Sequence, residues 1–168
     1  MQVTTIRHLI LVAVLLLPVW GCADDQPPTR LFDLADRVAL KVYKSPTCGC
    51  CGKWIEHAEG YGFDSEVFHP RDLNAVKAGY GIPPRYRSCH TAVSPDGFVF
   101  EGHIPAKVVR EFLNAPPADA IGLTVPAMPV GSPGMEVGDK FMPYQVLLLK
   151  KDGAVEVFSE VRAAAEQY

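Results

Sequence analysis

The pattern of hydrophobic and polar positions predicts strands and helices that alternate along most of the chain. Short runs of β-branched and aromatic residues, such as Val38 to Tyr43, are typical of buried strands. Helical segments end at glycines, as at Gly60 and Gly79, because glycine accepts a left-handed backbone. The predicted strands are 38–43, 63–69, 89–93, 98–103, 144–149 and 154–158. The predicted helices run from the cysteine-rich segment 48–51 to about 59, from 70 to 78 and from 104 to about 114, with a helical lead-in at 31–37 and a helical turn or tail at 161–168.

The order of these elements up to residue 114 is β-α-β-α-β-β-α. The segment Ser94-Pro95-Asp96-Gly97 is a turn signal between two predicted strands, so those strands form a hairpin. This order is that of a thioredoxin-like core of the glutaredoxin type. We therefore expect an α/β fold in which the cysteine-rich segment follows the first strand.

Residues 115–143 depart from this pattern. They contain six prolines and four glycines, which argue against a long helix and predict an ordered or semi-ordered loop. Met128, Met135 and Met142 also lie here. The two strands that follow, joined by Asp152-Gly153, predict an extra C-terminal β-hairpin beyond the core.

The amino terminus has the form of an export signal. A basic segment precedes an apolar run at 9–17, which is shorter than the ~20 residues of a membrane span. Val19-Trp20-Gly21-Cys22 resembles a bacterial lipoprotein box with Cys22 as the lipidated residue, and cleavage after Ala23 is the alternative. We expect a periplasmic protein, either free or anchored to the outer membrane through Cys22.

The expected domain organisation follows from these segments. Residues 1–22 form the signal peptide, 23–37 a polar tether, 38–160 the thioredoxin-like metal-binding domain and 161–168 the tail. The formal net charge is −3 and there is no basic cluster, which argues against a nucleic-acid partner.

Four cysteines remain beyond Cys22. Cys48, Cys50 and Cys51 combine a CxxC pair with a third thiol, whereas a dithiol redox couple needs only the pair. In a thioredoxin-like core the loop that enters the third strand packs against the start of the first helix, so Cys89 is expected near Cys48 and Cys51. An even number of cysteines in an exported protein also permits two disulfides, and this structural alternative stays open.

Four sulfurs in one pocket are suited to a soft metal. Thiolates at a helix N-terminus have lowered pKa values, and thiolates favour Cu(I). Because thiolates can bridge, the pocket could hold more than one Cu(I). A single tetrahedral zinc is the alternative, although the adjacency of Cys50 and Cys51 makes a regular site awkward. An iron–sulfur cluster is disfavoured by export in an unfolded state.

Two histidines and two methionines are further candidates. His90 follows Cys89, and His103 ends a strand that should approach the same edge, so each is either a ligand, a neighbour that orients a ligand, or a structural histidine. Met128 and Met135 lie in an irregular loop, where core packing explains them poorly, and thioethers bind Cu(I).

Several motifs together resemble the CopG-type copper-resistance family, formerly a domain of unknown function. They are Thr47-Cys48-Gly49-Cys50-Cys51-Gly52-Lys53-Trp54, Gly81-Ile82-Pro83, 88–93, 101–105 and 125–136. The resemblance implies a periplasmic, thioredoxin-like protein that binds copper through Cys48, Cys50, Cys51 and Cys89. It also implies a role in copper tolerance through oxidation or reduction of copper ions, with other periplasmic copper-handling proteins as partners.

The sequence therefore supports an exported copper-binding protein, and two other functions stay open. One is a metal-free thiol–disulfide oxidoreductase that uses Cys48 and Cys51. The other is a copper chaperone without turnover.

Overall fold

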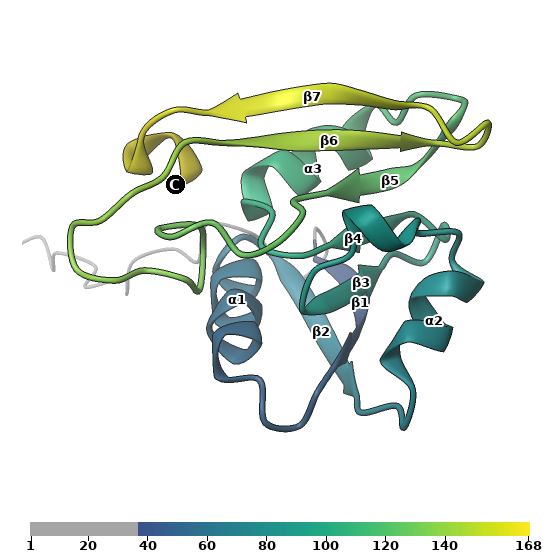
Figure 1. Ribbon diagram of the computed structural model, residues 1–168, viewed down its shortest axis with the longest axis horizontal. Coiled ribbons are helices and arrows are strands. Elements are labelled where there is room, and N and C mark those ends of the chain that lie inside the picture. The colour runs from purple at the N-terminus through teal and green to yellow at the C-terminus, as the bar shows by residue number, and fades with distance from the viewer. Residues whose placement is uncertain (1–36) are drawn as a thin grey trace, which may run out of the picture.

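The computed structural model describes residues 37–168, which form a seven-stranded sheet with three α-helices (Figure 1). The signal sequence, Cys22, the tether and the helical lead-in, all expected before residue 37, lie outside the described residues. The strands are β1 (Val38–Lys44), β2 (Phe63–Phe68), β3 (His90–Val93), β4 (Val99–Glu101), β5 (Ala120–Thr124), β6 (Tyr144–Lys150) and β7 (Val155–Val161). The helices are α1 (Gly49–Gly60), α2 (Leu73–Gly79) and α3 (Ala106–Asn114), with 3₁₀ turns η2 (Pro84–Tyr86) and η3 (Ala164–Gln167).

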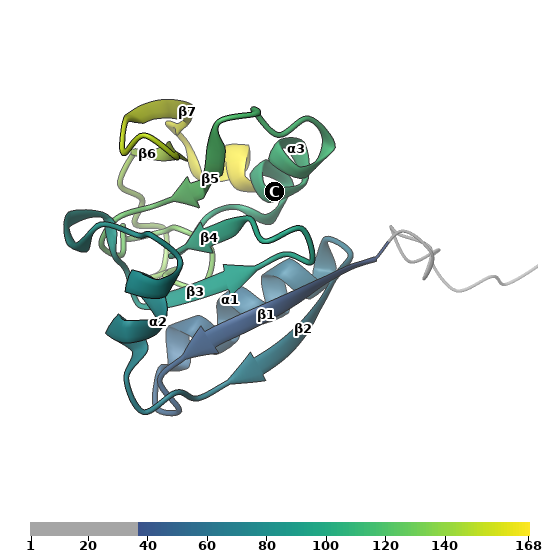
Figure 2. The ribbon, with the colours of Figure 1, turned by 90° about the vertical axis from the view of Figure 1, so that its right-hand side faces the viewer.

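The first half of the chain follows the predicted element order. The strands lie side by side in the order β2-β1-β3-β4-β5-β6-β7 (Figure 2). β1 pairs in parallel with β2 and antiparallel with β3, and β3 forms the predicted hairpin with β4. Because β1 and β3 are neighbours, the chain following β1 and the chain entering β3 meet at one end of the sheet.

The strand β5 corrects the prediction that residues 115–143 form a loop throughout. It pairs in parallel with β4 and antiparallel with β6, and so joins the C-terminal hairpin to the core sheet. Gly122 counted as a loop signal, yet this strand needs a glycine there. Its φ is +152°, and a Cβ would stand 1.8 Å from the Val99 carbonyl oxygen.

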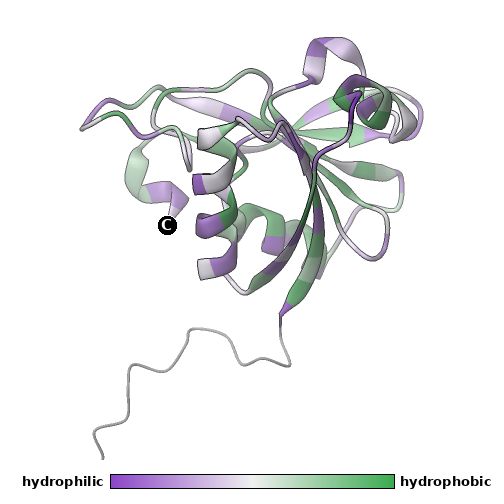
Figure 3. Ribbon diagram, turned by 90° about the horizontal axis from the view of Figure 1, so that it is seen from below, coloured by the Kyte–Doolittle hydropathy of each residue, from purple (hydrophilic) through white to green (hydrophobic). Residues whose placement is uncertain are grey.

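Hydrophobic residues pack on both faces of the sheet. Successive residues of a strand point to opposite faces, so Ala92 and Phe100 pack with α1 and α3, while Val93 and Val99 join a smaller cluster with Ile82. Figure 3 shows many hydrophobic positions on the strands, with hydrophilic positions on the sides of the helices that face away from the sheet. Within residues 37–168, none of the helices is both long and apolar enough to cross a membrane.

The C-terminal turn packs back onto the loop between β5 and β6. The side chain of Gln167 is fully buried and donates from Nε2 to the Gly131 carbonyl oxygen at 2.8 Å. The Tyr144 hydroxyl donates to Gln167 Oε1 at 2.5 Å. The predicted tail is therefore an ordered part of the fold that ties the loop to β6.

Candidate metal centre

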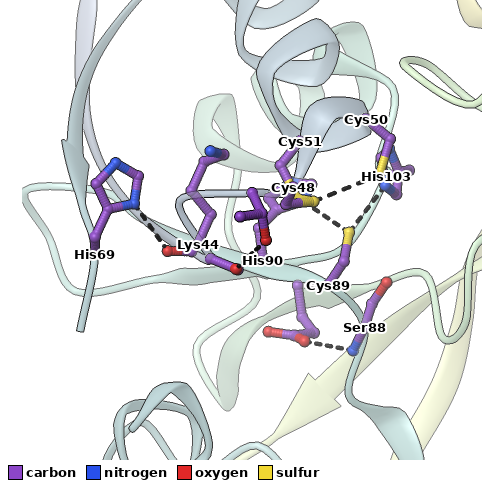
Figure 4. Close-up of a disulfide and its surroundings, with 12 residues drawn as sticks. Lys44, Cys48, Cys50, Cys51, His69, Ser88, Cys89, His90 and His103 are labelled. Carbon is purple, nitrogen blue, oxygen red and sulfur yellow. Dashed lines mark hydrogen bonds between the residues drawn. A yellow bond between two sulfur atoms is a disulfide. The ribbon is translucent and has the colours of Figure 1, made fainter. Parts of the chain in front are cut away.

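The CxCC segment lies at the start of α1, where the backbone N–H groups of the first turn have no partner within the helix. A turn in which the Cys48 N–H donates to the Ser45 carbonyl oxygen at 3.2 Å ends β1, and α1 begins at Gly49. Cys48 is thus the N-cap, while Cys50 and Cys51 lie in the first turn. Cys48 and Cys51 are joined by a disulfide (Figure 4). Cys51 is fully buried and Cys50 is a half-buried free thiol.

Cys89 meets this segment from the other side, as the sequence predicts. It immediately precedes β3, and its sulfur and those of Cys48, Cys50 and Cys51 all lie within 4.8 Å of one another. The structural alternative of two disulfides differs from what is found, since Cys50 and Cys89 are both free. The pocket therefore holds one disulfide and two thiols in contact range.

His103 and His90 point at Cys89 rather than away from it. His103 Nε2 lies 2.9 Å from Cys89 Sγ, and His90 Nδ1 lies 3.3 Å from the same sulfur (Figure 4). The other ring nitrogen of His103, Nδ1, donates to the Pro133 carbonyl oxygen at 2.7 Å, so Nε2 carries the lone pair in the neutral ring. His90 Nε2 is buried and has no hydrogen-bond partner.

Burial disfavours the charged forms of Cys89 and of the two histidines beside it. The pKa of Cys89 is raised to about 12, first by burial and then by the neighbouring Cys50. The expected lowering of thiol pKa values at the helix end therefore does not extend to Cys89, which lies outside α1. Burial also lowers the pKa values of His90 and His103, so both rings are neutral at pH 7 and have a lone pair to offer. A cation at this point would replace the thiol proton.

The loop before β6 covers the cysteine cluster. Gly134 has a φ of +86°, and a Cβ there would lie 2.6 Å from the Cys50 carbonyl oxygen. Next to it, Pro133 accepts the hydrogen bond from His103. The same loop is joined to the Cys89 segment where the Ser88 hydroxyl donates to the Ala127 carbonyl oxygen.

The methionines of this loop differ in exposure. Met135 follows Gly134 and is half-buried, whereas Met128 and Met142 are exposed. Their role as copper ligands stays a prediction.

A buried ion pair beside Cys89 is the feature that sequence reasoning missed. Lys77 Nζ lies 2.5 Å from Glu101 Oε1, and the two side chains are 2% and 0% exposed. Thr91 donates to Glu101 Oε2 at 2.6 Å, and the Ser88 N–H donates to Oε1 at 2.5 Å. Charged side chains are mostly found on surfaces, and the pattern of the chain carries no signal that would place Lys77 inside.

Four other residues singled out in the sequence differ in how far they are buried. Trp54 is fully buried one turn after the cluster, as expected, and donates from Nε1 to the Ile104 carbonyl oxygen at 2.8 Å. His69 is exposed, as expected. His57, also expected on the surface, is half-buried and accepts the Ala106 N–H at 3.0 Å. Lys53 is exposed.

The donor atoms that meet here are sulfur and imidazole nitrogen. Within residues 37–168, the groups that could hold a metal are Cys48, Cys50, Cys51 and Cys89, and the overlapping set of Cys89, His90 and His103. Neither group includes a carboxylate, and such donors suit copper or zinc rather than magnesium or calcium.

Comparison with known proteins agrees with this chemistry. Residues 86–135 match a family described as a protein of unknown function, DUF411. No curated protein matches the chain significantly. A solved structure titled "Copper resistance protein copG- Form 2" is 42% identical with a TM-score of 0.71, over 76% of this chain and 100% of that one. The Form 1 structure of the same title is 41% identical with the same TM-score and coverage. At this identity and coverage, the chain belongs to the CopG-type copper-resistance family.

Proposed function

We propose that this protein is an exported, periplasmic copper-binding protein that serves copper resistance and binds Cu(I) through Cys48, Cys50, Cys51 and Cys89. The observation that carries the proposal is the meeting of Cys89 with the CxCC segment, which puts four sulfur atoms within 4.8 Å of one another. Thiolate ligands select Cu(I) over hard cations. The titles of the two similar structures support copper as the ion.

We further propose that the four thiolates bind more than one Cu(I). A thiolate can bridge two metal ions, so four sulfurs that lie within 4.8 Å of one another can share more than one ion. Cys50 and Cys51 are adjacent in the chain, which disfavours a single regular tetrahedral site.

Copper binding and thiol oxidation are coupled in this proposal through Cys48 and Cys51. When both are thiols, two Cu(II) ions each accept one electron, the thiols lose two electrons and two protons, and an S–S bond forms. In the reverse direction, two Cu(I) ions give two electrons to the disulfide, which takes up two protons. The disulfide joins two of the four ligands, so oxidation removes half of the Cu(I) site.

The fold supports the same assignment. We propose that β1 to β4 with the three helices form a thioredoxin-like core, because the strand order β2-β1-β3-β4 puts a cysteine pair at the start of the first helix. Residues 1–22 are proposed as the export signal, with Cys22 as the anchor if it is lipidated.

A metal-free thiol–disulfide oxidoreductase is the second candidate function. The Cys48–Cys51 disulfide at a helix N-terminus favours it, because such positions activate thiolates. Cys50 distinguishes the two functions, since disulfide exchange does not need a third thiol. A copper chaperone without turnover would differ from the main proposal only in lacking conversion between Cu(I) and Cu(II).

The test is anaerobic titration of the fully reduced protein with Cu(I), with metal analysis and thiol counting on the same sample. We expect more than one copper per chain and few titratable thiols until the metal is removed. Cys50→Ser should reduce the copper content. The proposal is overturned if Cys50→Ser loads copper normally while Cys51→Ser abolishes disulfide exchange, or if the protein takes up one zinc and no copper.

A further inference from the structure

We propose that the disulfide form of the protein binds one Cu(II) at a second position, made by Cys89 Sγ, His103 Nε2 and His90 Nδ1. The proposal rests on the copper-binding function above and adds to it a separate ligand set for the oxidised ion. Cys89 is the residue that the two sites share.

The three donor atoms already surround one point. They all lie within 4.8 Å of one another, and the two nitrogens are 2.9 and 3.3 Å from Cys89 Sγ. Ligand atoms at about 2.0–2.3 Å from a tetrahedral metal stand about 3.5 Å apart. Small side-chain shifts would therefore open enough room for an ion between the sulfur and the two rings.

His103 is prepared to act as a ligand by its backbone partner. A histidine that binds a metal usually donates its other ring N–H to a carbonyl or carboxylate, which fixes the ring and its tautomer. His103 does this through the Pro133 carbonyl oxygen at 2.7 Å, and its Nε2 faces Cys89. The covering loop, through Pro133, thus orients the ligand.

His90 supplies the third donor atom from a fully buried ring. Trp54 packs on this ring with centroids 4.4 Å apart, and Nδ1 lies 3.3 Å from Cys89 Sγ. Nε2 has no hydrogen-bond partner, so no acceptor or donor at that atom fixes the tautomer of the ring. An ion bound at Nδ1 uses the lone pair there and leaves the ring proton on Nε2.

The redox state of the protein selects the ion that each set receives. In the dithiol state, the sulfur-rich set favours Cu(I). In the disulfide state, Cys48 and Cys51 are bonded to each other, and the donors that remain around Cys89 are the Cys50 thiol and the two imidazole rings. Two histidines with one cysteine are the trigonal ligands of known copper electron-transfer sites, and imidazole suits Cu(II). Because Cys89 serves both sets, an ion changes site by exchanging its other ligands.

The experiment uses the Cys50→Ser protein with the Cys48–Cys51 disulfide formed, so that Cys89 is the one free thiol among residues 37–168. One equivalent of Cu(II) is added anaerobically. We expect one bound Cu(II), a thiolate-to-Cu(II) charge-transfer absorption, and electron paramagnetic resonance couplings from two imidazole nitrogens.

Variants then assign the ligands. Losing the hydrogen-bond partner of a metal ligand weakens metal binding by about tenfold to hundredfold. In the same background, His103→Gln removes the ligand itself, so it should weaken Cu(II) binding by more than this. His90→Gln should remove one nitrogen coupling, and Cys89→Ser the charge-transfer band. His69→Ala is the matched control, because His69 is exposed and its Nδ1 bonds to the Lys44 carbonyl oxygen, away from the cysteine cluster. It should leave all signals unchanged. Circular dichroism confirms that each variant is folded.

The result that overturns the inference is Cu(II) bound without nitrogen coupling, Cu(II) bound equally well by folded His103→Gln and His90→Gln proteins, or no Cu(II) bound at all. Cu(I) loading of the reduced wild-type protein is measured in parallel. If that loading occurs while the Cu(II) signals are absent, only the second site is wrong. If the reduced protein takes up no Cu(I), the proposed function itself fails.

Discussion

At the scale of single residues, Lys77 and Glu101 determine where Cys89 stands. Glu101 lies on β4 opposite Thr91 of β3, and one of its oxygens accepts both Lys77 and the Ser88 N–H. Cys89 is the next residue after Ser88, so the buried carboxylate fixes the backbone that delivers the fourth sulfur.

Removing one partner of the Lys77–Glu101 ion pair should destabilise the folded protein. Glu101→Gln leaves the Lys77 charge buried without its counterion, and we expect the free energy of unfolding to fall by about 3–5 kcal/mol. The double variant Lys77→Met/Glu101→Gln, which removes both charges, should recover much of this loss. Urea unfolding measures the free energy of unfolding of the single and the double variant. Glu156→Gln is the control, because the pair that Glu156 forms with Lys150 lies at the surface. A double variant no more stable than the single one would contradict this account.

At the scale of elements, the loop before β6 depends on one close approach to α1. Gly134→Ala would place a Cβ 2.6 Å from the Cys50 carbonyl oxygen at a φ of +86°. We expect it to lift the loop from the cluster and to destabilise the protein by about 1–3 kcal/mol, the cost of a strained backbone position.

Gly138→Ala is the matched control for this change. Gly138 also has a positive φ, +55°, but nothing lies within 4 Å of its Cβ position. We expect Gly134→Ala alone to speed the release of Cu(I) to a chelator, which stopped-flow absorbance follows. Equal release rates for the two variants would show that the loop does not cover the ion.

His57 links α1 to α3 and makes this contact sensitive to acid. Burial lowers its pKa from 6.5 to about 4, although Glu136 opposes the shift, and the neutral ring accepts the Ala106 N–H. Between pH 6.5 and about 4 the unfolded chain therefore binds a proton that the folded protein excludes, and stability falls as the pH falls. His57→Gln should reduce this slope by less than about 1.4 kcal/mol per pH unit, because the half-buried ring keeps some contact with water.

Unfolding free energies measured from pH 7 to 4.5 test this prediction. His69→Gln serves as the control on an exposed histidine. An unchanged slope in His57→Gln would mean that other groups carry the acid sensitivity.

At the scale of the whole molecule, the fold should not depend on its disulfide. Cys48 and Cys51 are separated by three positions, and closing so small a ring stabilises a protein by no more than about 2 kcal/mol. We expect anaerobic reduction to lower the unfolding free energy by at most this amount and to leave the sheet intact. The Cys48→Ala/Cys51→Ala protein should not respond to reductant. Unfolding on reduction would contradict both this prediction and a Cu(I) site made of four thiolates.

How far the sequence predicts this molecule depends on the kind of signal. The alternation of strands and helices up to α3 and the approach of Cys89 to the CxCC segment follow from local pattern and element order, and both are found. β5 was missed because Gly122 and its neighbouring prolines indicate a loop unless the adjacent strand β4 is known. The Lys77–Glu101 pair and the buried state of His57 depend on distant parts of the chain, which no local pattern encodes.

The position of Trp54 has a practical consequence. Its indole packs against the His90 ring at an interplanar angle of 45°, and between residues 23 and 168 the chain has no other tryptophan. In a protein that begins at residue 23, tryptophan fluorescence would thus come from one indole next to the site, and a paramagnetic ion arriving there should quench it. The binding and release of such an ion could then be timed in the purified, unlabelled protein.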